Sequence, residues 1–341
     1  MNGMPDLNTL SFVTVVFLLA GYILLDGFDF GVGILHFFAK RGEDRRRLLG
    51  AIAPFWDGNE VWLVTAGGAL FAAFPKVYAA VFSGFYLAFV LFLFVLIFRA
   101  LAIEFRGKFS ALAWRGFWDA AFSVSSGLAG FLIGMVFGNL IQGIPLGTDG
   151  EFTGTFLGLF NPYALFSGLF AVSFFSMHGA LYLVLRTDGD LREKSRRWAG
   201  NAALLFVLFF ILLSAWTAFG VPWVTLLVKQ SPVLFMVPPA ILCAIFISMQ
   251  GIRRHWDFTA FLFSGFSMLA IIGTFAAALF PNLVISSSGG YPLTVYNACS
   301  SPKTLGIILR IASVGMPAVL IYTGYVYWVF RGKTASDRAY Y

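Results

Sequence analysis

The chain has 341 residues, of which 59% are hydrophobic and only 11% are charged. A soluble globular domain carries about 25% charged residues, so the composition excludes that class and indicates a multi-pass membrane protein that needs lipid as its solvent. The formal net charge of +7 gives no sign of nucleic-acid binding, because the basic residues fall in loops between apolar segments, where they set membrane orientation.

Nine apolar stretches are long enough, at about 20 residues each, to cross a bilayer as helices. In chain order they cover roughly residues 9–36, 50–74, 77–103, 120–142, 162–185, 199–219, 233–251, 258–280 and 304–330. We therefore predict an all-α fold with nine transmembrane helices. Residues 1–341 are expected to form a single integral-membrane domain, without a separate soluble domain.

The positions of the basic residues support this count and predict an orientation. Nineteen of the 23 Lys and Arg residues belong to loops on one predicted side. Only Lys76, Lys229 and Lys303 belong to the opposite loops, and Arg310 lies inside the ninth stretch. Loops rich in Lys and Arg stay in the cytoplasm, so the chain is predicted to have its N-terminal end outside and its C-terminal end inside.

Four carboxylates interrupt the first two apolar stretches. Asp26 and Asp29 lie in GYILLDGFDFGVG, and Asp57 and Glu60 lie in FWDGNEVW. The members of each pair are three residues apart, so they share one face of a regular helix. Acids inside a membrane are rare and usually functional, which makes these four the main candidates for chemistry.

The two pairs are predicted to lie at a similar depth. Asp29 precedes Lys40 by 11 residues, and Asp57 follows Arg47 by 10. At a rise of 1.5 Å per residue, both acids lie about 15 Å from the basic loop between their helices. We expect the four acids to form one site in the cytoplasmic half of the membrane.

Two interpretations of these acids stay open. Four carboxylates at one level cannot all be ionised in a dry helix bundle, which suits proton relay or cation capture. Alternatively they are purely structural, pairing with Arg99 or capping broken helices; Arg99 is a counter-ion in either case. Asn59, His178 and Arg310 are further candidates for polar support. Arg310 has no acid nearby in sequence, so its partner must come from another helix or another subunit, and a buried structural pair is favoured.

Histidine gives little support for a haem or metal site in this chain. His36 lies at the inner end of the first stretch, His255 lies in a basic loop, and only His178 lies well inside a stretch. A structural or interfacial role is expected for each, since no His and Met arrangement indicates an axial pair. Arg106 and Asp119 are close enough to the inner surface that we expect them to be solvated.

Five segments together resemble subunit II of the cytochrome bd family of quinol oxidases. They are DGFDFGVG (26–33), FWDGNEVWLVTAGGALFAAFP (55–75), SGFYLA (83–88), NPYAL (161–165) and TVYNACSSPKTL (294–305). The resemblance implies an electrogenic oxidase complex of the respiratory chain, which oxidises membrane quinol and reduces oxygen to water. It also implies a multi-pass protein of the cytoplasmic membrane of a bacterium or archaeon.

The family places the b-type and d-type haems on the larger partner, subunit I. The resemblance therefore implies a non-haem chain that binds no metal and has no catalytic residue of its own, with room for a structural quinone or lipid. It also implies two four-helix bundles plus a peripheral helix, packed against subunit I as a pseudo-symmetric heterodimer. Small single-helix accessory subunits are a further partner class.

The resemblance also assigns roles to individual acids. Asp57 of WDGN matches the family acid of a proton channel that leads from the cytoplasm to the haems, and Asp29 of GFDFG matches another polar site in the inner half. Glu60 occupies a variable position, where some members have Gln. We predict a proton pathway through Asp57, Glu60, Asp29 and Asp26.

Two other classes of function are considered. Acids in broken helices near the membrane midplane also suit an ion-coupled secondary transporter. The paired, discontinuous segments that such a transporter needs in both halves of the chain are missing from the sequence. The other class is a pure membrane scaffold, in which every buried acid is structural.

Overall fold

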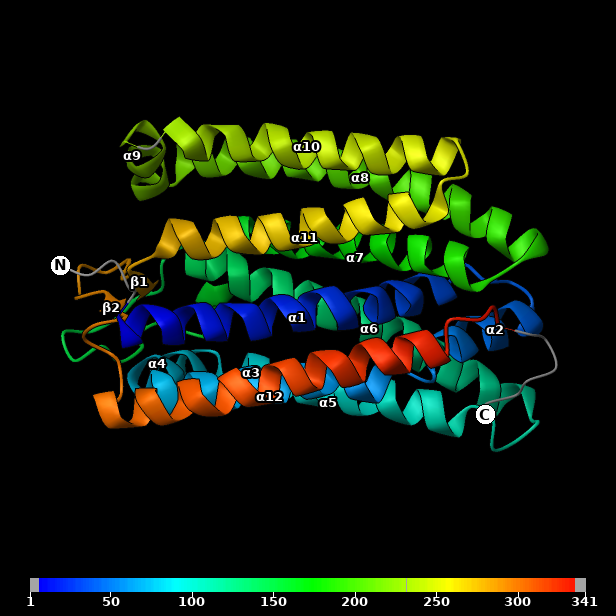
Figure 1. The fold of residues 1–341 in the computed structure, drawn as a ribbon, viewed down its shortest axis with the longest axis horizontal. Helices are drawn as coiled ribbons and strands as arrows, with labels where there is room; N and C mark the ends of the chain where they lie inside the picture. The colour runs from blue at the N-terminus through cyan, green and yellow to red at the C-terminus, as the bar shows by residue number, and fades with distance from the viewer. Residues whose placement is uncertain (1–5, 231, 335–341) are drawn as a thin grey trace.

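The computed structural model describes residues 6–230 and 232–334 and is mostly helical (Figure 1). Its α-helices are α1 (Leu7–His36), α2 (Gly42–Ile52), α3 (Trp56–Ala73), α4 (Pro75–Gly84), α5 (Tyr86–Phe105), α6 (Leu112–Gln142), α7 (Pro162–Arg186), α8 (Gly189–Gly220), α9 (Pro222–Gln230), α10 (Pro232–Arg253), α11 (Asp257–Leu279) and α12 (Pro302–Val329). A 3₁₀ turn, η1 (Leu157–Phe160), precedes α7. The strands β1 (Asn282–Val284) and β2 (Leu293–Thr294) form a small antiparallel pair, which the all-α prediction did not include.

Eight helices among the described residues are long and apolar enough to cross a membrane: α1, α5, α6, α7, α8, α10, α11 and α12. The prediction of a helical, multi-pass membrane protein is confirmed. The predicted second stretch, 50–74, is divided between the end of α2 and α3. α3 is not among the eight, because Asp57, Asn59 and Glu60 lower its hydropathy. The count of nine spans and the N-out, C-in orientation stay predictions.

Several helices begin where the sequence combines a capping side chain with proline. α7 begins at Pro162, and the side chain of Asn161 accepts a hydrogen bond of 2.8 Å from the backbone N–H of Ala164. α12 begins in the same way at Ser301 and Pro302. A polar side chain at this position satisfies a backbone donor that the helix leaves free, and proline at the first helical position lacks that donor altogether.

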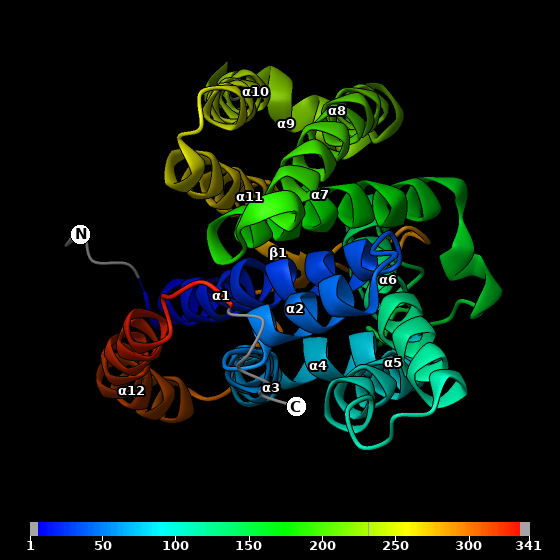
Figure 2. The same cartoon turned by 90° about the vertical axis from the view of Figure 1, so that its right-hand side faces the viewer.

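α1 runs through the middle of the molecule. It contacts α3, α6, α7, α11 and α12. Viewed along the helices, α8, α10 and α11 lie on one side of α1 and α3 and α5 on the other, while α12 lies at the edge (Figure 2). β1, β2 and α9 lie at one end of the helices and α2 at the other (Figure 1). The division into two four-helix bundles plus a peripheral helix stays a prediction.

The closest approach between α1 and α7 depends on two glycines. A Cβ atom at Gly31 would lie 1.9 Å from the carbonyl oxygen of Phe175. A Cβ atom at Gly179 would lie 2.5 Å from the carbonyl carbon of Gly31. Small residues allow such backbone contact between helices in lipid. This contact brings α7 close to the turn of α1 that carries Asp29.

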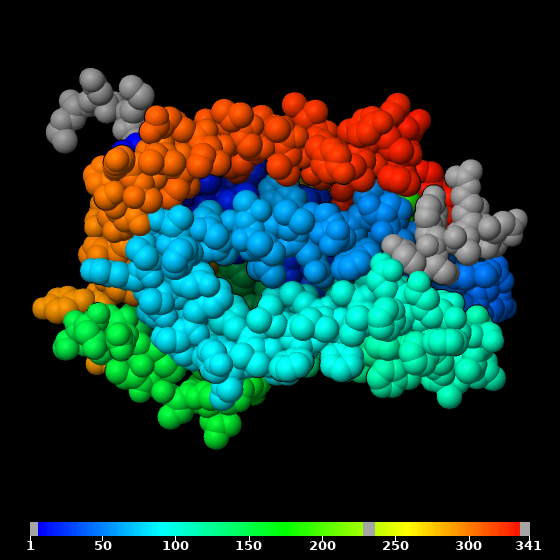
Figure 3. Space-filling view, turned by 90° about the horizontal axis from the view of Figure 1, so that it is seen from below, coloured from blue at the N-terminus to red at the C-terminus, as the bar shows by residue number. Residues whose placement is uncertain are grey.

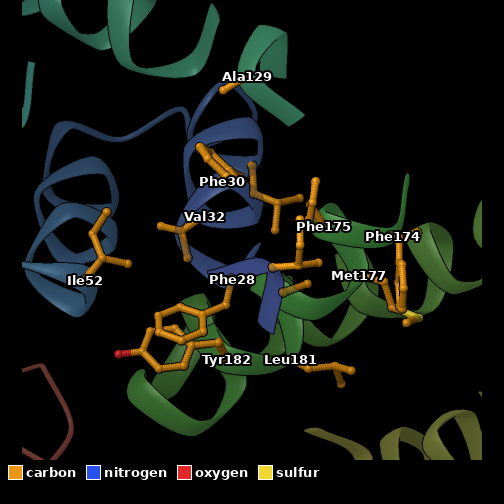
Figure 4. Close-up of a cluster of buried hydrophobic side chains, with 14 of the residues drawn as sticks. Phe28, Phe30, Val32, Ile52, Ala129, Phe174, Phe175, Met177, Leu181 and Tyr182 are labelled. Atoms are coloured by element: carbon orange, nitrogen blue, oxygen red, sulfur yellow. The ribbon is translucent and has the colours of Figure 1, made fainter. Parts of the chain in front are cut away.

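Aromatic rings fill the space between α1, α2 and α7. The rings of Phe28 and Tyr182 stack at a centroid distance of 4.1 Å (Figure 4). The hydroxyl of Tyr182 donates a hydrogen bond of 2.8 Å to the carbonyl oxygen of Ala51 in α2. Because this packing buries Phe28 on one side of α1, it fixes the rotation of the helix and therefore the direction in which Asp26 and Asp29 point.

Candidate functional site

Arg99 of α5 is fully buried and gathers three of the four acids that the sequence singled out. Its Nη2 atom lies 2.5 Å from Oδ1 of Asp26, and its Nη1 atom lies 2.9 Å from Oε1 of Glu60. The nearest oxygen of Asp29 lies 3.9 Å from Nη2. The ring of Phe30 lies 4.5 Å from the guanidinium carbon. We call these four charged residues the Arg99 cluster; it joins α1, α3 and α5.

The members of the Arg99 cluster differ in access to the surface. The side chains of Asp26 and Asp29 are completely buried, whereas that of Glu60 is 22% exposed. Asp26 accepts hydrogen bonds from both terminal nitrogens of Arg99. Nη2 donates to Oδ1 of Asp26, and Nη1 donates to Oδ2 at 3.1 Å. Such a bidentate pair is strong and directional. Glu60 is therefore the member through which the cluster reaches the surface of α3.

Asn59 links Asp29 to α12. Its Nδ2 atom donates to Oδ2 of Asp29 at 2.7 Å and to the carbonyl oxygen of Leu25 at 3.2 Å. Its Oδ1 atom accepts a hydrogen bond of 3.0 Å from the hydroxyl of Tyr327. The Tyr327 hydroxyl thus sets the orientation of the Asn59 amide. The other carboxylate oxygen of Asp29, Oδ1, is buried without a hydrogen-bond partner in the described structure.

Tyr327 was missed by the sequence analysis. It precedes Arg331 by four residues, so it lies at the basic end of the ninth predicted span. The signal that could have indicated it is its place in the inner half of that span, the half of the membrane in which Asp29 was also predicted to lie. Its ring also stacks on Phe55 at a centroid distance of 4.4 Å, immediately before the start of α3.

Asp57 lies apart from the Arg99 cluster. Its side chain is exposed in the first turn of α3, and it forms no hydrogen bond or ion pair in the part of the chain that the structure describes. It is one helical turn from Glu60, as the spacing predicts. The structure therefore brings three of the four acids together and leaves Asp57 on the surface beside them.

The remaining candidates for polar support are also separate from the cluster. His178 is buried in α7, where its Nδ1 atom lies 2.7 Å from the hydroxyl of Ser264 and its ring stacks on Phe261. Arg310 is exposed on α12 and, among the described residues, donates only to the carbonyl oxygen of Gly306, one turn earlier in its own helix. The expected buried partner for Arg310 is absent from the described residues, because this side of α12 faces outward.

A second charged cluster corrects the expectation for Arg106 and Asp119. Both side chains are largely buried rather than solvated, and they form an ion pair. Asp119 also lies 3.2 Å from Nε2 of His36 and 3.0 Å from Nη1 of Arg45. The solvated interpretation was wrong because three side chains from separate parts of the chain, His36, Arg45 and Arg106, pack around Asp119.

An apolar cavity of about 300 Å³ lies between α6, α7, α8, α10 and α11. Phe137, Phe170 and Met268 contribute to its lining. Its few polar groups include Tyr163 and Thr217, whose hydroxyl oxygens lie 2.6 Å apart. The cavity suits an apolar chain rather than a charged ligand.

The fold and the buried charges define a class. The protein is a multi-pass helical membrane protein that holds three carboxylates and one arginine in its interior, with a fourth acid exposed beside them. Within residues 6–230 and 232–334, no group of three or more His, Cys, Asp or Glu side chains could hold a metal ion.

Comparison with known proteins supplies the particular family. The model of the family "Cytochrome bd terminal oxidase subunit II" matches residues 7–330, and the chain belongs to this family. It is 36% identical over 369 residues to the cytochrome bd-I ubiquinol oxidase subunit 2 of Escherichia coli strain K12, with 98% of this chain and 97% of that protein covered. It is 33% identical over 334 residues to the cytochrome bd ubiquinol oxidase subunit 2 of Bacillus subtilis strain 168, with 97% and 98% covered.

A solved structure has the same fold. The bd oxidase from Geobacillus thermodenitrificans matches with a TM-score of 0.77 and 16% identity, over 95% of this chain and 98% of that one. The predicted family is thus confirmed, and the chain is a subunit of a quinol oxidase in the respiratory chain. As subunit II it belongs to a complex with a subunit I, and family membership is consistent with haems held by that partner.

Proposed function

We propose that this subunit conducts protons from the cytoplasm toward the oxygen-reduction site of its partner. The route begins at Asp57 and continues through the three acids of the Arg99 cluster, Glu60, Asp29 and Asp26. Support comes from the order of exposure: Asp57 is exposed, Glu60 is 22% exposed, and Asp26 and Asp29 are fully buried. Protons entering at the surface would therefore meet acids at increasing depth. α3 carries the first two of these acids and α1 the last two.

The observation that carries this proposal is the imbalance of charge in the Arg99 cluster. Three carboxylates share a single guanidinium group. Buried like charges at such distances do not all stay ionised, so the cluster holds protons as well as counter-charge. Asp29 is the acid farthest from Arg99 and has the unpartnered oxygen Oδ1. A protonated carboxyl at Asp29 removes the cost of burying that oxygen as a charge.

The face that carries Asp57 is the face on which we place subunit I. Only 6% of the residues in the apolar window of α12 are buried within the described structure. α12 lies along this face beside α3, and α5 lies on the far side of α3 (Figure 3). Subunit I, with the b-type and d-type haems, would cover these helices and Arg310, and bring its oxygen-reduction site within reach of Asp57.

The remaining details of the arrangement are part of the same proposal. The subunit crosses the cytoplasmic membrane of a bacterium or archaeon nine times, N-out and C-in, with α3 as the additional crossing. The helices form two bundles of four plus the peripheral α12, in a single membrane domain. Membrane quinol and oxygen are the substrates of the complex. Small single-helix accessory subunits are further partners in it. The apolar cavity is the place for a structural quinone or lipid.

Neutralising Asp57 tests the proton pathway. Asp57→Asn is expected to lower oxygen consumption per assembled complex by about tenfold or more, because loss of a proton-transfer group typically costs 10²–10⁴-fold when transfer limits the rate. Glu60→Gln is expected to have a smaller effect, since the resemblance to the family implies that some members have Gln at this position. Turnover is measured with an oxygen electrode and normalised to the haem absorbance of the purified complex.

The matched control is Asp149→Asn, which neutralises an exposed acid in the loop between α6 and α7. It should leave turnover unchanged. The haem spectrum of the Asp57 variant should also be unchanged, because the redox centres are on the partner. Normal turnover of a fully assembled Asp57→Asn complex rules out the pathway as we describe it.

A pure scaffold is the second candidate, and the bidentate pair between Arg99 and Asp26 favours it. A scaffold requires the buried charges only to hold α1, α3 and α5 together. Neutralising Asp26 or Asp57 would then reduce the yield of assembled complex, or change nothing. It would not reduce the turnover of the complex that does assemble, so the same measurement separates the two candidates.

A further inference from the structure

The turn between α10 and α11 is held in an unusual conformation by an arginine of α8. His255 in this turn has a φ of 61°, in the left-handed region that residues other than glycine rarely adopt. Arg196 contacts Nδ1 of His255 and donates to the carbonyl oxygen of Ile252 at 3.3 Å. Its Nη2 atom also lies 2.8 Å from Oδ1 of Asp257. Strain of this kind persists where surrounding contacts impose it, often at functional sites.

The clamped turn presents two arginines and two aromatic rings on the surface. Arg253 and Arg254 are exposed, and neither has an acidic partner within residues 6–230 and 232–334. The adjacent acid, Asp257, is already paired with two arginines of α8. Trp256 and Phe258 are 54% and 68% exposed. The guanidinium carbon of Arg254 lies 5.2 Å from the centre of the Trp256 ring.

The position of this turn narrows the choice of partner. It lies at the same end of the helices as α2, opposite the end that carries β1 and β2 (Figure 1). Most basic residues of the chain belong to loops at this end, which is the predicted cytoplasmic side. α10 and α11 also lie on the opposite side of α1 from α3 and α5 (Figure 2). The turn therefore faces the surrounding lipid and not the face that we assign to subunit I.

We propose that Arg253, Arg254 and Trp256 bind the headgroup of an acidic phospholipid of the cytoplasmic leaflet. An arginine guanidinium forms paired hydrogen bonds with phosphate oxygens. Tryptophan favours the level of the headgroups, where its ring is partly in lipid and its N–H in water. Phe258, on the first turn of α11, contacts the acyl chains of the same lipid. Basic clusters at the inner ends of membrane helices attract anionic lipids in this way.

Lipid retention by the purified complex tests this proposal. The complex is exchanged into nanodiscs of phosphatidylcholine in which about one lipid in ten is phosphatidylglycerol. The lipids that stay bound after transfer to detergent are counted by native mass spectrometry. We expect Arg253→Gln combined with Arg254→Gln to lower the phosphatidylglycerol retained, relative to phosphatidylcholine, on the order of tenfold. The Lys-for-Arg double variant should retain most of it.

The control is Lys108→Gln combined with Arg115→Gln, which removes two exposed charges at the α5–α6 connection. It should retain as much phosphatidylglycerol as the unmodified complex. An unchanged haem absorbance shows that each variant has assembled. Equal retention by the Arg253 and Arg254 double variant overturns the proposal. So does displacement of the lipid by inorganic phosphate at millimolar concentration, because the turn would then be a site for a free anion.

Discussion

Arg99 shows how one side chain can decide the charge state of its surroundings. Its two terminal nitrogens are occupied by Asp26 and Glu60, and Asp29 lies at the limit of ion-pair distance. Burial of the guanidinium costs free energy, which these acids and the ring of Phe30 offset. The acids in turn stay in the interior because Arg99 is there. Neither the arginine nor the acids can be understood as separate residues.

Removing the charge of Arg99 is expected to destabilise the protein strongly. In Arg99→Gln the three acids lose their counter-charge in a buried position, and breaking a buried pair from one side costs about 3–5 kcal/mol. The thermal unfolding temperature of the purified complex should fall, and so should its yield. Lys108→Gln, which neutralises an exposed lysine, is the comparison and should have no effect. An unchanged unfolding temperature in Arg99→Gln would mean that the cluster contributes little to stability.

The sequence predicted some of these residues better than others. Asp26 and Asp29 lie on the same side of α1, as their spacing predicted, because α1 is a regular helix through this region. Asp57 has the predicted helical position but not the predicted surroundings, since spacing gives the face of a helix and not what covers that face. Tyr327 and Asn59 meet across 268 positions of sequence. A contact of that kind depends on how α12 packs, which no local pattern reports.

At the scale of helices, the contact between α1 and α7 is the tightest constraint. Gly31→Ala would place a methyl group 1.9 Å from the carbonyl oxygen of Phe175, which belongs to the backbone and cannot move aside. We expect a loss of at least about 1–3 kcal/mol in the free energy of unfolding, together with a lower yield of complex. Thermal unfolding followed by haem absorbance measures the effect.

The comparison for this variant is Gly273→Ala in α11, where an added Cβ atom would meet nothing within 4 Å. Alanine favours the helix by roughly 0.5–1 kcal/mol over glycine, so this variant should be neutral or slightly more stable. If Gly31→Ala lowers the free energy of unfolding and Gly273→Ala does not, the loss is due to the contact between α1 and α7. If Gly31→Ala behaves like Gly273→Ala, α1 and α7 are farther apart than described.

Helix boundaries were predictable where hydropathy changes sharply. The stretch predicted at 162–185 is α7, Pro162–Arg186, because proline and a capping asparagine mark its start. α8 begins at Gly189, ten residues before its predicted start at 199. Its first turns are charged and were assigned to a loop. They are helical because Lys194 pairs with Asp44, and two arginines pair with Asp257, so the helix continues beyond the apolar stretch.

At the scale of the whole molecule, the orientation in the membrane can be measured directly. In a background lacking Cys243 and Cys299, Glu151→Cys should react with a membrane-impermeant maleimide in intact cells. Lys108→Cys should react only after the membrane is permeabilised. Both positions are exposed, and they lie in loops predicted on opposite sides. Labelling of Lys108→Cys in intact cells would contradict the N-out, C-in arrangement.

The family could be recognised from the sequence, but the geometry of its polar interior could not. Motifs such as DGFDFGVG and the basic residues of alternate loops are local and can be read along the chain. The pairing of Asp119 with residues of α1, α2 and α5 is not local. It depends on the packing of α2 against α1 and α7, which no local pattern reports.

The hydroxyl of Tyr327 has a consequence for assembly. It reaches from a helix with little buried surface to the amide that faces Asp29. The position of α12 therefore determines whether that amide keeps its orientation. Subunit I, on the face where we propose it, would help to hold α12 in this position. A sideways shift of this helix by little more than the length of one hydrogen bond would release the amide. A helix at the edge of the described structure would thus connect the docking of a partner to the hydrogen bonding of a fully buried acid.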